Sequence, residues 1–220
     1  MSAIVTLAAL PVAALVLWTL LRSRVGGRLV AVPTGERWHE RPTPTFGGVG
    51  IFAGFATGVL LAVAVGAVDA SPELLGVLGG CALLFLAGLV DDVRSLSPAL
   101  KLAAQLGAAG IVLASGLSAE IVGNDVLAAA LAVVWLVGIT NAFNLLDNMD
   151  GLAATLAAIA CAYFALGAVT GETEPIVLVV ALALGLALLG FLPFNLRPRR
   201  GAAVFMGDSG SQLLGFALAS

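Results

Sequence analysis

The chain has 220 residues, of which 60% are hydrophobic and only 10% are charged, with a formal net charge of -3. Its mean hydropathy is +1.10, whereas roughly a quarter of the residues in soluble domains are charged. This composition excludes an ordinary water-soluble domain, and the charge balance gives no reason to expect a nucleic-acid partner.

Seven apolar stretches each approach the roughly 20 residues that a transmembrane helix needs. Ala, Leu, Val and Gly dominate them and alternating strand patterns are absent, which favours a helical bundle over a β-barrel. We therefore predict an all-α, polytopic transmembrane bundle that forms one domain, with seven complete spans and the start of an eighth near Ser209. The seven stretches are residues 3–21, 46–68, 73–90, 99–117, 126–143, 152–169 and 176–194.

The basic residues all fall at alternate connections between these stretches. The first stretch has no basic segment before it, so we interpret it as a retained span and not as a signal peptide. The positive-inside rule then predicts that the amino terminus lies outside and that the first, third, fifth and seventh connections are cytoplasmic. Those connections carry Arg22, Arg24, Arg28, Arg37, Arg41, Arg94, Lys101, Arg197, Arg199 and Arg200.

The first of these connections contains the segment RWHERPTPTFGG, which ends at Gly48. Proline and glycine near a helix start leave free amide groups that suit an anion, which makes Thr45, Gly47 and Gly48 candidate substrate-binding residues. An ordinary membrane-entry loop with interfacial Trp and Arg is the alternative. His39, the only histidine, is a weak candidate for acid-base chemistry.

Two adjacent carboxylates, Asp91 and Asp92, end the third apolar stretch. They repel each other and are costly to bury, so a cation should compensate them. Mg²⁺ suits this position because it takes one or two carboxylates together with water and phosphate oxygens. Arg94 and Lys101 are the competing source of positive charge, and a solvated helix end with salt bridges is a further alternative.

The fifth stretch ends in ITNAFNLLDNMDGLAA, which carries Asn141, Asn144, Asp147 and Asp150 at intervals of three. On an unbroken helix these side chains would spread around half of the circumference. Asn and Gly tolerate left-handed backbone, so we predict a helix break over residues 148–151. A polar pocket at that break is one interpretation, and a capped helix end followed by a capped helix start is the other.

Asp208 lies between Gly207 and Ser209, immediately before the last apolar segment. Asp or Ser at this point is a good N-cap, and the role is compatible with ligand binding. Phe205 could stack on a flat ring or lie at the membrane interface. The sequence has neither a P-loop nor a GxGxxG motif. We interpret Cys81 and Cys161 as small core hydrophobes.

Five ordered motifs carry a resemblance to a known family. They are PTPTFGG, the DD of LVDDVRSLSPALK, NAFNLLDNMDGLA, GFLPFN and FMGDSGS, and they cover the chain from about Arg37 to its end. The chain resembles the polyprenyl-phosphate N-acetylhexosamine-1-phosphate transferases of the glycosyltransferase family 4 type. That family includes undecaprenyl-phosphate N-acetylglucosamine-1-phosphate transferase and phospho-N-acetylmuramoyl-pentapeptide transferase.

The resemblance implies a Mg²⁺-dependent reaction, with Mn²⁺ as a substitute, at the cytoplasmic face of the plasma (inner) membrane. A polyprenyl phosphate, undecaprenyl or decaprenyl, would attack a UDP-N-acetylhexosamine and release UMP. Carried over by motif, Asp91, Asp92 and Asp208 are catalytic, and Asp208 and Asp92 hold the metal. The substrate-binding residues are Lys101, Asn144, Asp147, Asp150, Phe205, Thr45, Gly47, Gly48 and Asn195.

The resemblance leaves open which branch of the family the chain belongs to. The short gap from Asp92 to Lys101 favours the N-acetylglucosamine branch over the muramoyl-pentapeptide branch. The family carries Gly where this chain has Asn148, and it continues through further spans, so we expect a C-terminally truncated domain; a homodimer is compatible. Rivals of another class are an ion-coupled transporter and an intramembrane aspartyl protease, both of which need carboxylates deep within the bilayer.

Overall fold

The computed structural model describes residues 2–23, 30–31, 43–117, 123–171, 174–197 and 201–220. Over these residues the chain is helical apart from its connections and one short antiparallel pairing, in which Val30 faces Pro44 and Ala31 faces Thr43. The elements are η1 (Ser2–Ala8), α1 (Ala9–Arg22), β1 (Val30–Ala31), β2 (Thr43–Pro44), α2 (Gly47–Ala64), α3 (Pro72–Val93), α4 (Pro98–Ala114), α5 (Asp125–Leu146), α6 (Leu152–Thr170), α7 (Pro175–Asn195) and α8 (Gly207–Ala219).

Local signals in the sequence explain several helix starts. Ser71 caps α3 by accepting a hydrogen bond from the Leu74 amide group at 3.3 Å, and Asn124 caps α5 by accepting one from Leu127 at 3.0 Å. Ser97 caps α4 in the same way. Proline is the first residue of α3, α4 and α7, where its fixed φ and missing N–H group are tolerated.

Every apolar stretch predicted from the sequence is a helix. Within the part of the chain that the structure describes, six helices are long and apolar enough to cross a membrane, and α4, with 17 residues, is shorter. The predicted helix break is also present, because α5 ends at Leu146 and α6 begins at Leu152. Gly151 in this break has φ +75, a left-handed conformation that glycine adopts without steric cost. The all-α membrane bundle is therefore confirmed.

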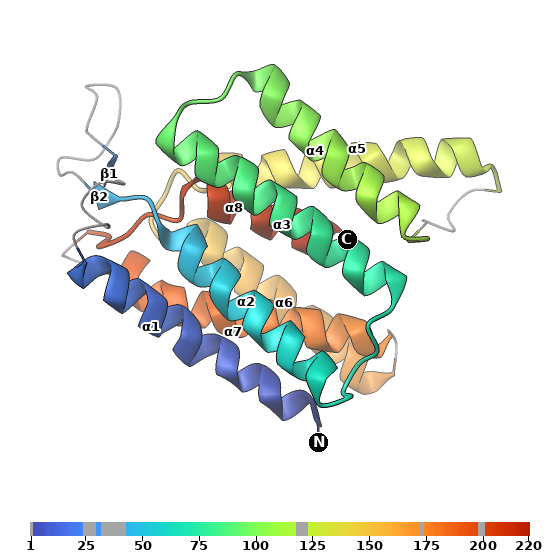
Figure 1. The fold of residues 1–220 in the computed structure, drawn as a ribbon, viewed down its shortest axis with the longest axis horizontal. Helices are drawn as coiled ribbons and strands as arrows, with labels where there is room; N and C mark the ends of the chain where they lie inside the picture. Colours follow the sequence, from blue (N-terminus) through green and yellow to red (C-terminus); the bar gives the residue numbers. More distant parts are fainter. Residues whose placement is uncertain (1, 24–29, 32–42, 118–122, 172–173, 198–200) are drawn as a thin grey trace.

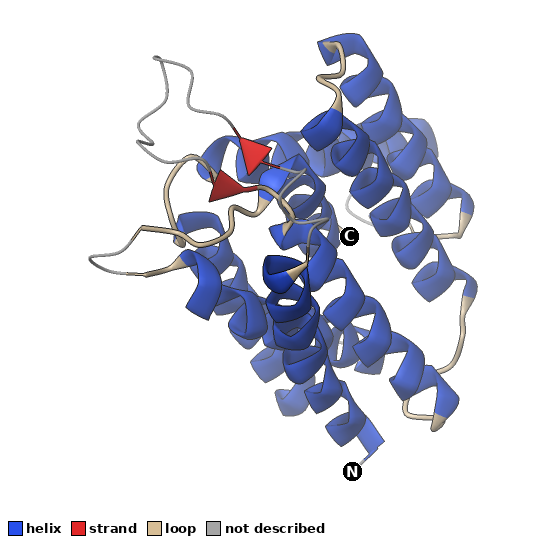
Figure 2. Cartoon of the chain, turned by 60° about the vertical axis from the view of Figure 1, so that its left-hand side comes forward, coloured by secondary structure: helices blue, strands red, loops and turns tan. Residues whose placement is uncertain are grey.

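The helices form two groups that meet at α8 (Figure 1). Helices α1, α2 and α7 pack with one another, and α6 packs against α7. In the second set, α4 packs against both α3 and α5. Helix α8 packs against α2, α3 and α5 and so joins the two groups. Its residues from Ser209 to Ala217 are all buried. Figure 2 shows that the two strands lie at one end of the bundle.

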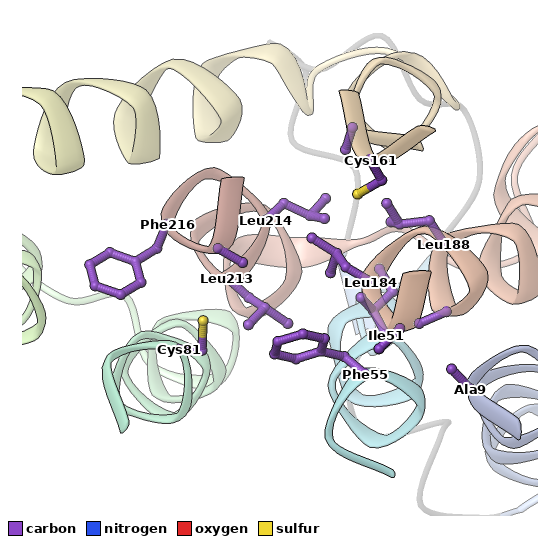
Figure 3. Packing of buried hydrophobic residues seen from close by; sticks show 14 of the residues in the cluster. Ala9, Ile51, Phe55, Cys81, Cys161, Leu184, Leu188, Leu213, Leu214 and Phe216 are labelled. Atoms are coloured by element: carbon purple, nitrogen blue, oxygen red, sulfur yellow. The ribbon is translucent and has the colours of Figure 1, made fainter. Parts of the chain in front are cut away.

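The core of the bundle is apolar and surrounds α8. Figure 3 shows Leu213, Leu214 and Phe216 of α8 facing side chains from the neighbouring helices. Both cysteine thiols lie in this cluster, and neither forms a disulfide. The interpretation of Cys81 and Cys161 as core hydrophobes is confirmed.

Candidate active site

The polar motifs meet because consecutive helices run in opposite directions. The carboxyl ends of α3, α5 and α7 and the amino ends of α2, α4, α6 and α8 then lie at one end of the bundle, beside the two strands (Figure 1). Asp91 and Asp92 are in the last turn of α3, whereas Lys101 and Asp208 are in the first turns of α4 and α8. Residues separated by more than a hundred positions are thus adjacent in space.

Lys101 forms the centre of this cluster. Its ammonium group makes one ion pair with Asp91 and a second with Oδ2 of Asp208 at 2.6 Å. The other oxygen of Asp91, Oδ1, accepts a hydrogen bond from the Leu96 amide group at 2.6 Å. The Lys101 side chain is 31% exposed, so one cation screens two carboxylates and is still accessible to a ligand.

Asn144 joins the cluster from α5. Its Nδ2 group donates to Oδ1 of Asp208 at 3.1 Å and to Oγ of Ser211 at 2.9 Å. Both oxygens of Asp208 therefore have a donor, Asn144 on one side and Lys101 on the other. These contacts fix the orientation of the Asp208 carboxylate.

Asp92 has different partners from Asp91. Its two oxygens accept hydrogen bonds from the amide groups of Asp208 and Ser209 and from the Ser209 hydroxyl group. The prediction that Asp208 or Ser209 caps α8 is wrong, because neither side chain closes the first turn. A carboxylate from another helix takes that role.

The helix break after α5 carries Asp147 and Asp150. Burial raises the pKa of Asp147 to about 8, and three neighbouring carboxylates act in the same direction, those of Asp208, Asp92 and Asp150. Asp150 accepts a hydrogen bond from the Ala202 amide group at 3.2 Å. The excess of negative charge around Asp147 is an environment that favours a bound cation.

The four polar residues of this motif do not meet at one point. Asn141 faces α4, where it exchanges two hydrogen bonds with Gln105, with donor–acceptor distances of 2.8 and 3.3 Å. Asn144 faces α8, and Asp150 faces the segment before α8. The motif therefore connects α5 to three different neighbours.

Asn195 is buried at the end of α7, and its side chain is occupied by backbone groups. Its Oδ1 accepts from the Gly151 amide group at 2.6 Å, and its Nδ2 donates to the Val204 carbonyl group at 2.9 Å. Asn195 thus ties the helix break to the segment that leads to Phe205. These hydrogen bonds give Asn195 a structural role, and its predicted role in substrate binding stays a prediction.

The amide groups of Gly47 and Gly48 are not available to an anion. Gly47 donates to the Phe205 carbonyl group at 2.9 Å, and Gly48 donates to Met206 at 2.8 Å. The expectation of free amide groups at this helix start is wrong, because the segment before α8 covers them. The Thr45 carbonyl group lies beside Gly207. Phe205 is partly exposed, and His39 lies outside the described residues.

Sequence reasoning missed Gln105, Ser209 and Ser211 as members of the site. Gln105 follows Lys101 by one turn and is a polar residue in an apolar helix, which is a signal that could have identified it. Ser209 and Ser211 were visible only as part of the turn before α8. Their partners, Asp92 and Asn144, could be assigned only after the helices were placed.

The cluster offers oxygen donors, as a hard divalent cation requires. Among the described residues, no group of three or more His, Cys, Asp or Glu side chains has the geometry to hold a metal by itself. Mg²⁺ needs only one or two carboxylates when phosphate oxygens and water complete its coordination. Asp208 and Asp147 are the carboxylates we consider for this role. Backbone amide groups hold both oxygens of Asp92, whereas the donors to Asp208 are side chains, which can rotate away from it.

An apolar cavity of about 640 Å³ lies apart from these groups, between α4, α5 and the end of α8. Its lining includes Leu113, Trp135 and Ile139 and has no acidic or basic residue. It offers nothing for acid-base or phosphate chemistry. The polar end of the bundle is therefore the candidate active site.

Comparison with known proteins agrees with this location. Residues 74–220 match the family described as Glycosyl transferase family 4. This chain belongs to that family. The matched region includes Asp91, Asp92, Lys101, Asn144, Asp147 and Asp208, the polar residues of the cluster described above.

Individual relatives of this family 4 chain carry related names. It is 33% identical over 211 residues to the probable undecaprenyl-phosphate N-acetylglucosaminyl 1-phosphate transferase of Bacillus subtilis, covering 91% of this chain and 57% of that protein. It is 34% identical over 223 residues to the decaprenyl-phosphate N-acetylglucosaminephosphotransferase of Mycobacterium tuberculosis, covering 91% and 54%. The chain thus spans a little over half the length of these two relatives.

A shorter match is to the phospho-N-acetylmuramoyl-pentapeptide-transferase of Oceanobacillus iheyensis. It is 50% identical over 92 residues and covers 42% of this chain and 27% of that protein. Both branches of the family that the motifs resemble are therefore represented among the relatives.

Proposed function

We propose that this protein transfers N-acetylglucosamine 1-phosphate from UDP-N-acetylglucosamine to a polyprenyl phosphate and releases UMP. The observation that carries the proposal is the Lys101 ammonium group held between Asp91 and Asp208 at the polar end of a membrane bundle. The names of the relatives from Bacillus subtilis and Mycobacterium tuberculosis support the sugar and the lipid acceptor.

The reaction needs positive charge more than it needs a base. A phosphate oxygen of the lipid attacks the β-phosphorus of the UDP-sugar, and the bond from that phosphorus to the bridging oxygen breaks. UMP leaves with the bridging oxygen, so one phosphorus–oxygen bond forms and one breaks. The attacking phosphate is already ionised at neutral pH, so no proton has to be removed. Catalysis then depends on positioning and on cations that screen repulsion between the phosphates.

The residues of the cluster have distinct parts in this scheme. Lys101 supplies a fixed positive charge to the phosphates, and Asp91 holds the Lys101 side chain in place. Asn144 and Lys101 orient Asp208. Mg²⁺, which the donor set fits, would be held by Asp208 and Asp147 and would neutralise phosphate charge. Asp150 and Phe205 are our candidates for the nucleoside, and Thr45, Gly47 and Gly48 shape the wall next to α8.

The membrane arrangement belongs to the same proposal. The basic residues after α1, α3 and α7 support a cytoplasmic position for the polar end of the bundle and an outside position for the amino terminus. The helices α1 to α8 would each cross or enter the plasma membrane, α4 and α8 included. A site at the bilayer edge lets an isoprenoid tail stay in hydrocarbon while its phosphate reaches Lys101.

The test is UMP release by membranes that contain the full-length protein, with UDP-N-acetylglucosamine as the donor. We expect release only when Mg²⁺ and a polyprenyl phosphate are both added, and a lipid-linked sugar as the second product. Membranes with Lys101→Met are the matched control. Release that does not require the lipid, or that survives this substitution, would contradict the proposal.

The second candidate function is transfer of phospho-N-acetylmuramoyl-pentapeptide. The 50% identity over 92 residues to the Oceanobacillus iheyensis protein favours it. The same assay with the UDP-linked muramoyl-pentapeptide as donor separates the two. We expect at least tenfold lower turnover with that donor, and the opposite preference would assign this chain to the other branch.

A further inference from the structure

The amino end of α8 is held by a side chain from a different helix. Oδ1 of Asp92 accepts a hydrogen bond from the Asp208 amide group at 2.7 Å. Oδ2 accepts one from the Ser209 amide group at 3.1 Å and one from the Ser209 hydroxyl group at 2.7 Å. Three donors at the start of α8 therefore point at one carboxylate.

Helix α8 has no cap of its own. Met206 precedes it in helical conformation, and no side chain of the first turn accepts a capping hydrogen bond. The first amide groups of a helix lack partners within the helix, and leaving them unpaired in an apolar setting is costly. A carboxylate at this position also interacts favourably with the helix dipole. Asp92 meets both requirements at once.

Glycines allow this contact. A Cβ atom at Gly88, one turn before Asp92, would lie 2.5 Å from the Asp208 carbonyl oxygen. A Cβ atom at Gly207 would lie 2.7 Å from Oδ2 of Asp92, and Gly207 has φ +76. Both positions are therefore closed to a side chain, and the backbones of α3 and α8 approach each other directly.

We propose that Asp92 is a positioning residue that clamps the start of α8 to α3 and thereby sets Asp208 against Lys101. The adjacent aspartates then differ in role: Asp91 pairs with the catalytic lysine, and Asp92 holds a helix and does not bind the metal. The inference rests on the proposed function for its catalytic consequence. It contradicts the sequence-based expectation that Asp92 and Asp208 share a metal ion.

The first experiment compares Asp92→Asn with Asp208→Asn, which make the same chemical change at two residues. Hydrogen–deuterium exchange of the metal-free, full-length protein follows the amide groups at the start of α8. We expect Asp92→Asn to speed that exchange by about tenfold, in line with the loss of charge-assisted hydrogen bonds, and Asp208→Asn to leave it unchanged. Equal protection in wild-type protein and Asp92→Asn would overturn the clamp.

The second experiment measures Mn²⁺ binding to the same proteins. We expect Asp208→Asn to weaken binding at least tenfold and Asp92→Asn to weaken it no more than about threefold, the effect of removing a nearby charge that is not a ligand. Equal losses in both variants would make Asp92 a metal ligand and overturn the proposal. If wild-type protein binds no Mn²⁺, the metal of the proposed function fails, and the exchange data still decide the clamp.

A third variant, Ser209→Ala, keeps every carboxylate and removes only one of the three donors. We expect faster exchange at the start of α8 and a kcat lowered about threefold to tenfold, with unchanged Mn²⁺ affinity and an unchanged KM for the UDP-sugar. A metal role for Asp92 predicts no effect of this substitution on kcat. That result would contradict the clamp even if Asp92→Asn fails to fold.

Discussion

On one side of α8, helices α1, α2 and α7 meet through glycine and alanine. A Cβ atom at Gly54 would lie 2.5 Å from the Ala9 carbonyl oxygen, and one at Gly190 would lie 2.5 Å from that of Leu10. On the other side, α3, α4 and α5 meet α8 through Asp92, Lys101 and Asn144. Close apolar packing stabilises helix association in lipid without any polar group.

The apolar contacts on one side of α8 serve the stability of the bundle, and the polar contacts on the other side serve its chemistry. Helices α1, α2 and α7 contact one another through small residues, and these contacts depend only on complementary shape. The polar contacts around α8 require a defined geometry, because each donor needs an acceptor at a defined distance and angle. Substitutions at the close glycine contacts should therefore change mainly stability, and substitutions of Lys101, Asp92 or Asn144 should change mainly turnover.

The largest effect should come from Lys101→Met. It removes the cation between Asp91 and Asp208, so we expect kcat to fall by about 10² to 10³, as for the loss of one charge-stabilising donor. Lys101→Arg, which keeps the charge, should recover part of the activity. UMP release at saturating UDP-sugar is the measurement. A variant without this charge that kept normal turnover would show that the polar region is not the site.

The next effect concerns the apolar region. Gly54→Ala places a methyl group against backbone, so we expect a loss of about 2–3 kcal/mol in unfolding free energy. Gly110→Ala is the matched control, since no atom lies within 4 Å of its Cβ position, and helix propensity favours alanine there by up to about 1 kcal/mol. Thermal unfolding in detergent compares them. Similar transition temperatures would refute close packing at Gly54.

The smallest effect tests Gln105 and Asn141, the amide pair one turn below Lys101. Gln105→Asn or Asn141→Gln alone should cost about 1 kcal/mol of stability, the typical value for such pairs between membrane helices. The reciprocal double variant restores the combined side-chain length and should recover most of it. A double-mutant cycle on unfolding free energy gives the coupling. Additive losses would mean that the pair does not join α4 to α5.

Much of the fold could be predicted from the sequence. Hydropathy located every helix to within a few residues, because a span must hide its backbone polar groups and its side chains must be apolar. The break after α5 was predictable from Asn148 and Gly151, whose backbone preferences are local. The sequence also predicted that Asp91, Asp92, Lys101, Asn144 and Asp208 would lie close together, because charged residues in so apolar a chain need compensating partners.

The hydrogen-bond and ion-pair partners of those residues could not be predicted from the sequence. Asp91 and Asp92 are neighbours in the chain, yet one faces Lys101 and the other faces α8. The sequence predicts free amide groups at Gly47 and Gly48, but both donate to backbone carbonyl groups of Phe205 and Met206. In each case the deciding partner lies far away in the sequence, on an element whose position depends on packing.

The sequence by itself determined that this chain is a helical membrane protein, about where its helices lie, and that its basic residues fall at alternate connections. These properties follow from the free-energy cost of placing polar groups in hydrocarbon. That cost applies to each segment of the chain independently of its tertiary neighbours. Only the tertiary structure decided that α8 lies between two groups of helices and that Asp92 caps it. Hydrogen-bond partners depend on distances of about 3 Å, and such distances exist only once the helices are packed.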